Sequence, residues 1–168
     1  MNPPDIVIRP AVKSDVPALG RLGASLMRQH FEFDPLRFLR PGDKPEEGYA
    51  WFLGTQLNRD DATIFVADHQ GVVIGYAYAA VEPLSWEDLR DECGVIHDLV
   101  VDATAQQRGV GTALMQSALA WMRHRGLARA VLSTSPRNER AQRLFDRLGF
   151  RRTMIEMTRE LSEDDGKE

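Results

Sequence analysis

A short glycine-containing loop between a predicted strand and a predicted helix constrains this chain more than any other feature. The apolar, β-branched run over residues 95–101 predicts a buried strand. The polar loop that follows carries Gly109 and Gly111, and apolar residues recur at helical spacing from Val110 onward. The first N–H groups of a helix lack intrahelical partners and carry partial positive charge. Because glycines also let the backbone approach an anion closely, the loop predicts a phosphate-binding site.

Two common nucleotide-binding motifs do not fit this loop. The dinucleotide fingerprint needs a small residue three positions after its second glycine, where this chain has Leu114. A P-loop ends in Gly-Lys-Ser/Thr, and no lysine precedes Thr112. The predicted ligand is therefore phosphorylated but is not indicated to be a dinucleotide or a nucleoside triphosphate.

Two segments resemble motifs of the GNAT N-acetyltransferase superfamily. Residues 106–111, Gln-Gln-Arg-Gly-Val-Gly, are similar to its pyrophosphate loop, Gln/Arg-x-x-Gly-x-Gly/Ala. Residues 138–150, NERAQRLFDRLGF, are similar to the Asn-x-x-Ala-x-x-Leu/Phe-Tyr-x-x-Leu-Gly-Phe segment that closes the family core. The opening residues 8–11, followed by Asp15, also resemble the family. The resemblance covers nearly the whole chain and is weakest over residues 28–60.

The order of the predicted elements favours an α/β (mixed α+β) fold with helices on both faces of a mixed sheet. Strands are predicted over residues 5–9, 62–67, 72–81, 95–101, 130–134 and 150–158. Helices are predicted after an N-cap at Ser14, over 46–57, from 110 to a C-cap near Gly126, and over 139–148, with a loop over 31–44. The resemblance implies a mostly antiparallel sheet that splays open between its fourth and fifth strands.

Length and composition indicate a single domain over residues 1–168, with a polar tail over 160–168 that is expected to be flexible. The net charge of −4 disfavours nucleic acid as a partner. No apolar run approaches the ~18 residues of a membrane span, and the first residues do not resemble a signal peptide. Cys93 is the only cysteine, which excludes an internal disulfide and favours a reducing cytoplasm.

The resemblance implies acetyl-CoA as the acyl-donor substrate, with no metal. In the family, the pyrophosphate is held by backbone N–H groups of the glycine loop. The matching residues here are Arg108, Gly109, Val110, Gly111 and Thr112, with Gln106 beside them.

Further cofactor contacts are implied along the fourth strand and the closing helix. The fourth strand would pair with the pantetheine arm through Leu99, Val100 and Val101, with a bulge aiming one N–H at the thioester carbonyl. Asn138 would hydrogen-bond the same arm, act as a helix N-cap, or both. Phe145 occupies the position where the family often has a tyrosine that protonates the leaving thiolate, and phenylalanine has no proton to donate.

The candidate catalytic residues follow from the proton transfers that amide formation needs. His97 and Asp98 are adjacent, so only one faces the cleft unless a bulge intervenes. His97, with an ordinary pKa near 6.5, suits a general base, and a satisfied, partly buried histidine is the alternative. Asp98 could instead orient a cationic substrate. Tyr78, or Tyr76, is a possible acid, and strand packing is the alternative for both.

Other polar and aromatic residues complete the predicted acceptor side. Glu82, Glu32 and Asp34 are candidates to orient a cationic substrate or are solvated surface carboxylates. Residues 30–35 and Trp51-Phe52 are expected to form an acceptor wall or a simple core cluster.

The predicted function is transfer of acetyl from acetyl-CoA to a primary amine, slightly favouring a small molecule, by direct attack in a ternary complex. The alternatives are an acyl-CoA-binding sensor or partner-binding module with little turnover, and a protein N-terminal or lysine acetyltransferase. A homodimer mediated by the last strand is a further expectation from the resemblance.

Overall fold

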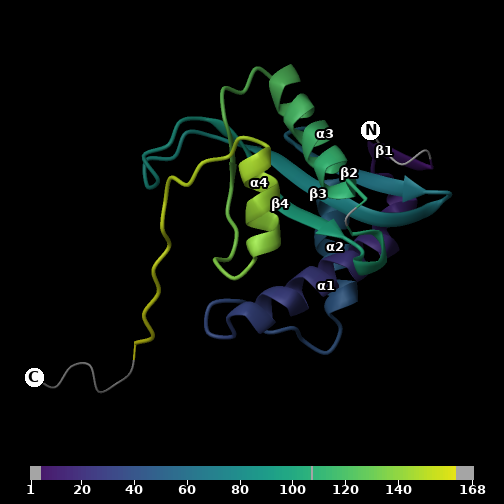
Figure 1. The fold of residues 1–168 in the computed structure, drawn as a ribbon, viewed down its shortest axis with the longest axis horizontal. Helices are drawn as coiled ribbons and strands as arrows, with labels where there is room; N and C mark the ends of the chain where they lie inside the picture. Colours follow the sequence, from purple (N-terminus) through teal and green to yellow (C-terminus); the bar gives the residue numbers. More distant parts are fainter. Residues whose placement is uncertain (1–4, 107, 162–168) are drawn as a thin grey trace, which may run out of the picture.

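A single five-stranded sheet forms the centre of the molecule (Figure 1). The structure, a computed structural model, describes residues 5–106 and 108–161. The strands are β1 (Ile6–Pro10), β2 (Ala62–His69), β3 (Val72–Glu82), β4 (Cys93–Val101) and β5 (Ala130–Leu132), in that spatial order. Neighbours from β1 to β4 are antiparallel, and β5 runs parallel to β4. The predicted mixed, mostly antiparallel sheet is confirmed.

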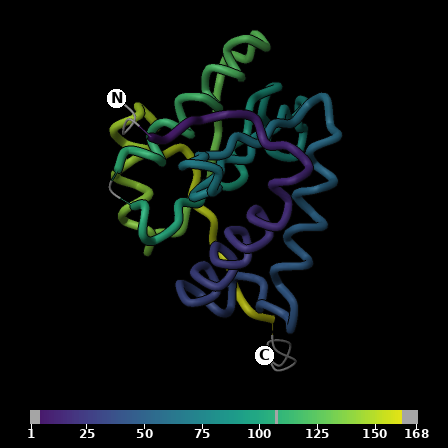
Figure 2. The backbone as a smooth tube through the Cα atoms, turned by 90° about the vertical axis from the view of Figure 1, so that its right-hand side faces the viewer, coloured from purple at the N-terminus to yellow at the C-terminus, as the bar shows by residue number. Residues whose placement is uncertain are grey.

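Helices cover both faces of this sheet. The helices are α1 (Val16–Phe33), α2 (Pro45–Gln56), α3 (Val110–His124) and α4 (Glu139–Arg147), with short 3-10 turns at Lys13–Asp15 and Ala103–Ala105. Figure 1 shows α1 and α2 on one side of the strands and α3 on the other, and Figure 2 shows the same separation from a perpendicular direction.

Each face buries its own apolar core. Leu19, Leu22 and Leu53 pack with Tyr76 and Tyr78 of β3 on the α1–α2 side. Ile96 packs with Met115, Ala118, Met122 and Phe145 on the side of α3 and α4. Period-2 alternation in the strands and 3.6-residue spacing in the helices produce these two apolar faces.

The sheet opens between β4 and β5. The two strands pair only over Gly94–Ile96 and Ala130–Leu132, and β4 then continues for five more residues without β5 beside it. The predicted splay between the fourth and fifth strands is therefore present. It leaves backbone groups on one side of β4 without a strand partner.

A β-bulge lies in β4 at His97. Tyr78 pairs with Asp98, and the next residue of β3, Ala79, pairs with Ile96, so His97 is the extra residue. A bulge of this kind redirects the side chains around it.

Three local predictions were wrong. The strand predicted over 150–158 does not form. Residues 151–161 have no regular secondary structure, and no described strand supplies the hydrogen-bond partners that a strand needs. Ser14 lies within a 3-10 turn, and Asp15 is the N-cap of α1. The loop predicted to start at residue 31 starts after Phe33, because nothing breaks the helix before Pro35.

Other expectations concern the termini and the membrane. The tail predicted to be flexible lies largely outside the described residues, which end at 161. Within the described ranges, no helix combines the length and apolarity of a membrane span.

Candidate functional site

A cleft with a volume of about 380 Å³ occupies the opening between β4 and β5. It is bounded by the two strands, by α4, and by α1, α2 and the loop between them. The described residues that line it are Leu26, Met27, Gln29, His30, Phe38, Leu39, Tyr49, Ile96, His97, Asp98, Leu99, Leu132, Ser133, Thr134, Asn138, Ala141 and Phe145. The first seven of these, from Leu26 to Tyr49, are called here the α1–α2 wall.

The bulge brings both candidate catalytic side chains to the same face of the sheet. The His97 ring stacks on Tyr78, with centroids 4.9 Å apart, and Asp98 accepts a hydrogen bond from the Tyr76 hydroxyl at 2.9 Å. Tyr76 and Tyr78 are two residues apart on β3 and share the face toward α1 and α2. Without the extra residue, strand alternation would place His97 and Asp98 on opposite faces.

Asp98 is a half-buried carboxylate held by tyrosines. Besides the bond from Tyr76, it interacts with the hydroxyl of Tyr49 on α2. Burial raises the pKa of Asp98 above its ordinary value, and the hydrogen bond from Tyr76 opposes this effect. Burial and the charge of Asp98 also raise the pKa of Tyr49, so Tyr49 remains a hydrogen-bond donor at neutral pH.

His97 has a carboxylate next to its outer nitrogen. Its Nε2 lies 3.5 Å from Oε1 of Glu82, which also accepts a 2.6 Å hydrogen bond from Arg90 through its other oxygen. Burial lowers the pKa of His97, Glu82 raises it, and Arg59 lowers it further. The net direction is downward, so at neutral pH the imidazole is predominantly the neutral form that accepts protons.

The tyrosines proposed as acids are engaged elsewhere. The Tyr78 hydroxyl donates to Oε1 of Gln56 at 2.9 Å, in a buried position, and the fully buried Tyr76 donates to Asp98. Neither is among the described residues that line the cleft, whereas Phe145 is. The Phe145 ring packs edge-on against Phe150.

The glycine loop leads directly into α3. Gly109 is the N-cap, with a φ of 76° that favours glycine, and its carbonyl accepts the hydrogen bond of Ala113 at 3.0 Å. The amides between these residues are those that a helix start leaves unpaired. Gly111 is close-packed, because a Cβ there would lie 3.3 Å from Leu144 of α4. The loop residue Gln107 lies outside the described residues.

Side chains tie this loop to β4 and α4. Gln106 donates to the carbonyl of Val101 at 3.2 Å and accepts from Arg140. Asn138 caps α4 by accepting from the Ala141 amide at 3.2 Å, and it also lines the cleft. The cap role predicted for Asn138 is therefore observed.

The three residues predicted to pair with pantetheine follow the bulge. Leu99, Val100 and Val101 pair with β3 on one side only. The bulge itself was expected among these residues and lies instead at His97, so that part of the prediction was wrong. The bulge position depends on the β3–β4 register, which the sequence of β4 does not specify.

The α1–α2 wall differs from the predicted acceptor wall. His30 lines the cleft, and its ring makes edge contacts with Phe33 and Phe38. Trp51, in contrast, is 73% exposed and is not a lining residue. Tyr49, which no sequence pattern singled out, is the α2 residue that lines the cleft, where Trp51 and Phe52 were expected.

Tyr49 depends on a glycine in the neighbouring helix. A Cβ built at Gly23 of α1 would lie 2.1 Å from the Tyr49 ring, and one at Gly20 would lie 2.5 Å from the carbonyl oxygen of Glu46. The two glycines therefore let α1 and α2 pack closely, and Gly23 leaves space for the tyrosine.

The flanking carboxylates predicted to orient a substrate do not line the cleft in the described part of the chain. Asp34 accepts hydrogen bonds from the amides of Leu36 and Arg37, and Glu82 binds Arg90. Among the described residues, no cluster of three or more His, Cys, Asp or Glu side chains suits a metal ion.

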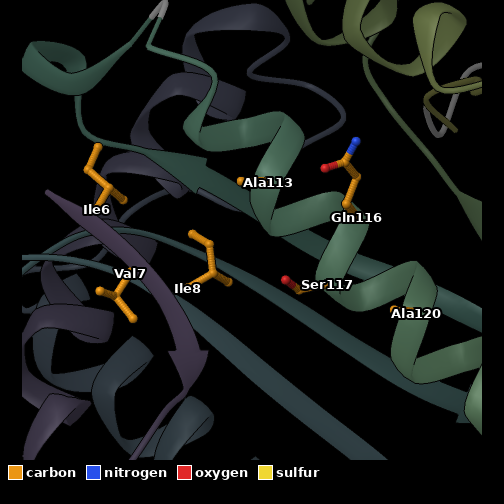
Figure 3. Close-up of a pocket in the computed structure, with 7 residues that line it drawn as sticks. All are labelled: Ile6, Val7, Ile8, Ala113, Gln116, Ser117 and Ala120. Carbon is orange, nitrogen blue, oxygen red and sulfur yellow. The ribbon is translucent and has the colours of Figure 1, made fainter. Parts of the chain in front are cut away.

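A second, more open hollow of about 570 Å³ lies between β1 and α3. Figure 3 shows Ile6, Val7 and Ile8 on the strand and small or polar residues such as Ser117 on the helix. None of its described lining residues carries an ionisable side chain. Of these two hollows, only the cleft between β4 and β5 therefore offers side chains for acid–base chemistry.

Together, the open mixed sheet, the cleft at its splay and the glycine loop at the start of α3 define an acetyltransferase-like fold. Solved structures agree. A protein from Bacillus halodurans superposes with a TM-score of 0.78 at 22% identity, over 92% of this chain and 99% of the other. An aminoglycoside N-acetyltransferase in complex with CoA superposes with a TM-score of 0.71 at 21% identity, over 93% and 94% of the two chains.

Sequence comparison identifies the family. The profile of the acetyltransferase (GNAT) family matches residues 25–150. A mycothiol acetyltransferase from Thermomonospora curvata is 33% identical over 121 residues, which cover 68% of this chain and 38% of that protein. The chain thus spans about two fifths of the length of the mycothiol acetyltransferases it matches. It belongs to the GNAT acetyltransferase family, as the two sequence motifs indicate.

Proposed function

We propose that this protein transfers an acetyl group from acetyl-CoA to the primary amine of a small molecule. The observation that carries this proposal is the β4 bulge, which places His97 and Asp98 together in a cleft whose lining residue Leu99 neighbours Gly111 of the glycine loop. Family membership and the CoA complex of a structural neighbour support acetyl-CoA as the donor. The helix start at Gly109–Thr112 supplies the N–H groups and partial positive charge that a diphosphate requires.

The chemistry needs two proton transfers, of which one involves a protein side chain and the other runs directly between the two substrates. Neutral His97 takes one proton from the acceptor ammonium. The free amine attacks the thioester carbonyl, the C–S bond breaks, and the thiolate of CoA leaves. The nitrogen, positively charged after attack, loses its second proton to that sulfur as the amide forms. The products are the N-acetyl amine and CoA thiol, and the proton on His97 returns to solvent.

This sequence of steps does not require a tyrosine in α4. Because the attacking nitrogen itself carries the proton that the sulfur gains, Phe145 is compatible with turnover. Its ring instead contributes an apolar surface to the cleft. No covalent enzyme intermediate is needed, since Cys93 is buried and is not among the described lining residues.

The test is amine-dependent release of CoA thiol from acetyl-CoA, measured over a panel of small amines, aminoglycosides and peptides. We expect small amines to promote release and His97→Gln to lower kcat/KM about 100-fold, within the range for loss of a general base. His124→Gln, at an exposed position in the last turn of α3, is the matched control and should retain activity. Release that depends on peptides alone would replace the small-molecule proposal with an N-terminal or lysine acetyltransferase.

The absence of a cleft hydroxyl at Phe145 also favours a second candidate, a CoA-binding sensor with little turnover. The same experiment separates the two candidates when it is combined with calorimetry. Micromolar binding of acetyl-CoA without amine-dependent thiol release from any member of the panel would identify the sensor. No binding at millimolar acetyl-CoA would exclude both.

We also propose a location and an assembly. The unpaired Cys93 thiol suits a reducing compartment, and the cytoplasm is the proposed location. The side chains of Met154, Ile155 and Met157 are almost fully exposed and offer an apolar surface for a homodimer. Light scattering of the full chain, compared with a variant carrying Ser at all three positions, tests the dimer.

A further inference from the structure

The cleft has a single acidic lining residue among those the structure describes, the half-buried Asp98. Within the described chain, no Lys or Arg side chain lies within 4.0 Å of the Asp98 carboxylate. Its hydrogen bonds come from neutral tyrosine hydroxyls. Because the cost of desolvation outweighs the electrostatic contribution of His30, the charged Asp98 is incompletely compensated, and an ammonium group entering the cleft would stabilise it.

The α1–α2 wall beside Asp98 is mostly apolar. Four of its seven residues are Leu, Met or Phe, and the rest are Gln29, His30 and Tyr49. The seven residues of the wall therefore include no carboxylate that could receive a second ammonium.

We infer that the acceptor is a primary monoamine on an apolar body, an alkylamine or arylalkylamine, rather than a polycationic amine. The ammonium would lie at Asp98, next to His97, and the apolar body would lie against Leu26, Phe38 and Leu39. This inference rests on the proposed function and narrows its substrate class. A second ammonium would have to leave water for an apolar wall, and the loss of its hydration is not repaid there.

The first test compares amines of different charge, one pair of which is matched in chain length. Hexylamine and phenethylamine are the monoamine probes, hexamethylenediamine is the matched diamine, and kanamycin is the polycation. We expect kcat/KM for the two monoamines to exceed that for the diamine and kanamycin by tenfold or more. A higher kcat/KM for the diamine or kanamycin would overturn the inference and leave the proposed acetyl transfer intact. Absence of thiol release with every amine would overturn both.

The second test adds a negative charge to the α1–α2 wall and measures the change in preference between a diamine and a monoamine. Leu39 lines the cleft yet is 74% exposed, so Leu39→Asp should fold normally. The quantity compared is the ratio of kcat/KM for hexamethylenediamine to kcat/KM for hexylamine. We expect this ratio to be at least fivefold higher in Leu39→Asp than in wild type. Leu36→Asp is the matched control, because Leu36 is 77% exposed in the same loop and is not a described lining residue. Equal preference ratios in the two variants would overturn the placement of the amine body against the wall.

The third test addresses Asp98 directly. Asp98→Asn preserves the shape of the side chain and removes its charge. We expect it to raise KM for hexylamine at least tenfold and to leave the Kd for acetyl-CoA, measured by calorimetry, within twofold of the wild-type value. Asp60→Asn, at an exposed turn, is the control and should leave both quantities unchanged. An unchanged KM for hexylamine in Asp98→Asn would overturn the assignment of the ammonium to this carboxylate.

Discussion

Replacing Glu82 by glutamine removes a negative charge beside His97 and keeps the side chain nearly the same size. The carboxylate stabilises the protonated imidazole, so its loss should lower the pKa of His97 further below its ordinary value. If neutral His97 is the base, kcat/KM rises with pH as the imidazole loses its proton. The acid limb of the profile should therefore move to lower pH in Glu82→Gln.

The size of this shift follows from the geometry. At the observed separation of 3.5 Å, two unit charges interact by about 1 kcal/mol in the dielectric of water. That value is appropriate because both side chains are about one-third exposed, and it corresponds to about 0.7 of a pKa unit. The other groups that face His97 are Arg59, Tyr78 and Asp98. Arg90, released from Glu82 in the variant, would act in the same direction as the substitution.

The assay is the pH dependence of kcat/KM at low and high salt. We expect the acid limb to shift downward by about 0.5–1 unit, and we expect 1 M salt to reduce the difference between wild type and variant, because such salt shortens the screening length to about 3 Å. Glu160→Gln, at an exposed position in the tail, should leave the profile unchanged. An upward shift, or identical profiles for wild type and Glu82→Gln, would refute His97 as the titrating base.

Three further predictions concern stability and cofactor affinity. Tyr76→Phe removes a hydrogen bond to the half-buried Asp98 and should lower the free energy of unfolding by about 1.5–3 kcal/mol in urea titrations. A change below about 0.5 kcal/mol would contradict a stabilising role for this contact. Gly109→Ala places an alanine in the left-handed region, which should lower the free energy of unfolding by about 1 kcal/mol and weaken acetyl-CoA binding measured by calorimetry. Gly42→Ala, in open space and without a positive φ, should lower the free energy of unfolding less. Asn138→Ala should destabilise α4 by about 1 kcal/mol and raise KM for acetyl-CoA; an effect on stability alone would confine Asn138 to the cap.

The strand–loop–helix unit over residues 95–124 could be predicted because its signals are local. The apolar run of β4, the two glycines and the helical spacing after Val110 each specify structure within a few residues. The family resemblance extended this local pattern to a sheet that opens beside β4. The same resemblance pointed to Asn138 and Phe145, and both line the cleft.

The features that sequence reasoning left open or missed depend on contacts between distant segments. The bulge at His97 is a property of the register with β3, and Tyr49 reaches the cleft because Gly23 of another helix leaves space for it. The segment over 150–158 has a composition suited to a strand but has no described neighbour with which to pair. Alternation alone predicts which side chains would share a face, and it does not supply the partner.

The glycine at position 23 has a consequence for how substrate preference can evolve. It is not among the residues that line the cleft, yet any heavier residue there would displace Tyr49 and loosen its hold on Asp98. Two relatives with identical cleft residues could therefore prefer different amines because of a single substitution at position 23, where α1 packs against α2. Residue-by-residue comparison of the cleft would not reveal that difference.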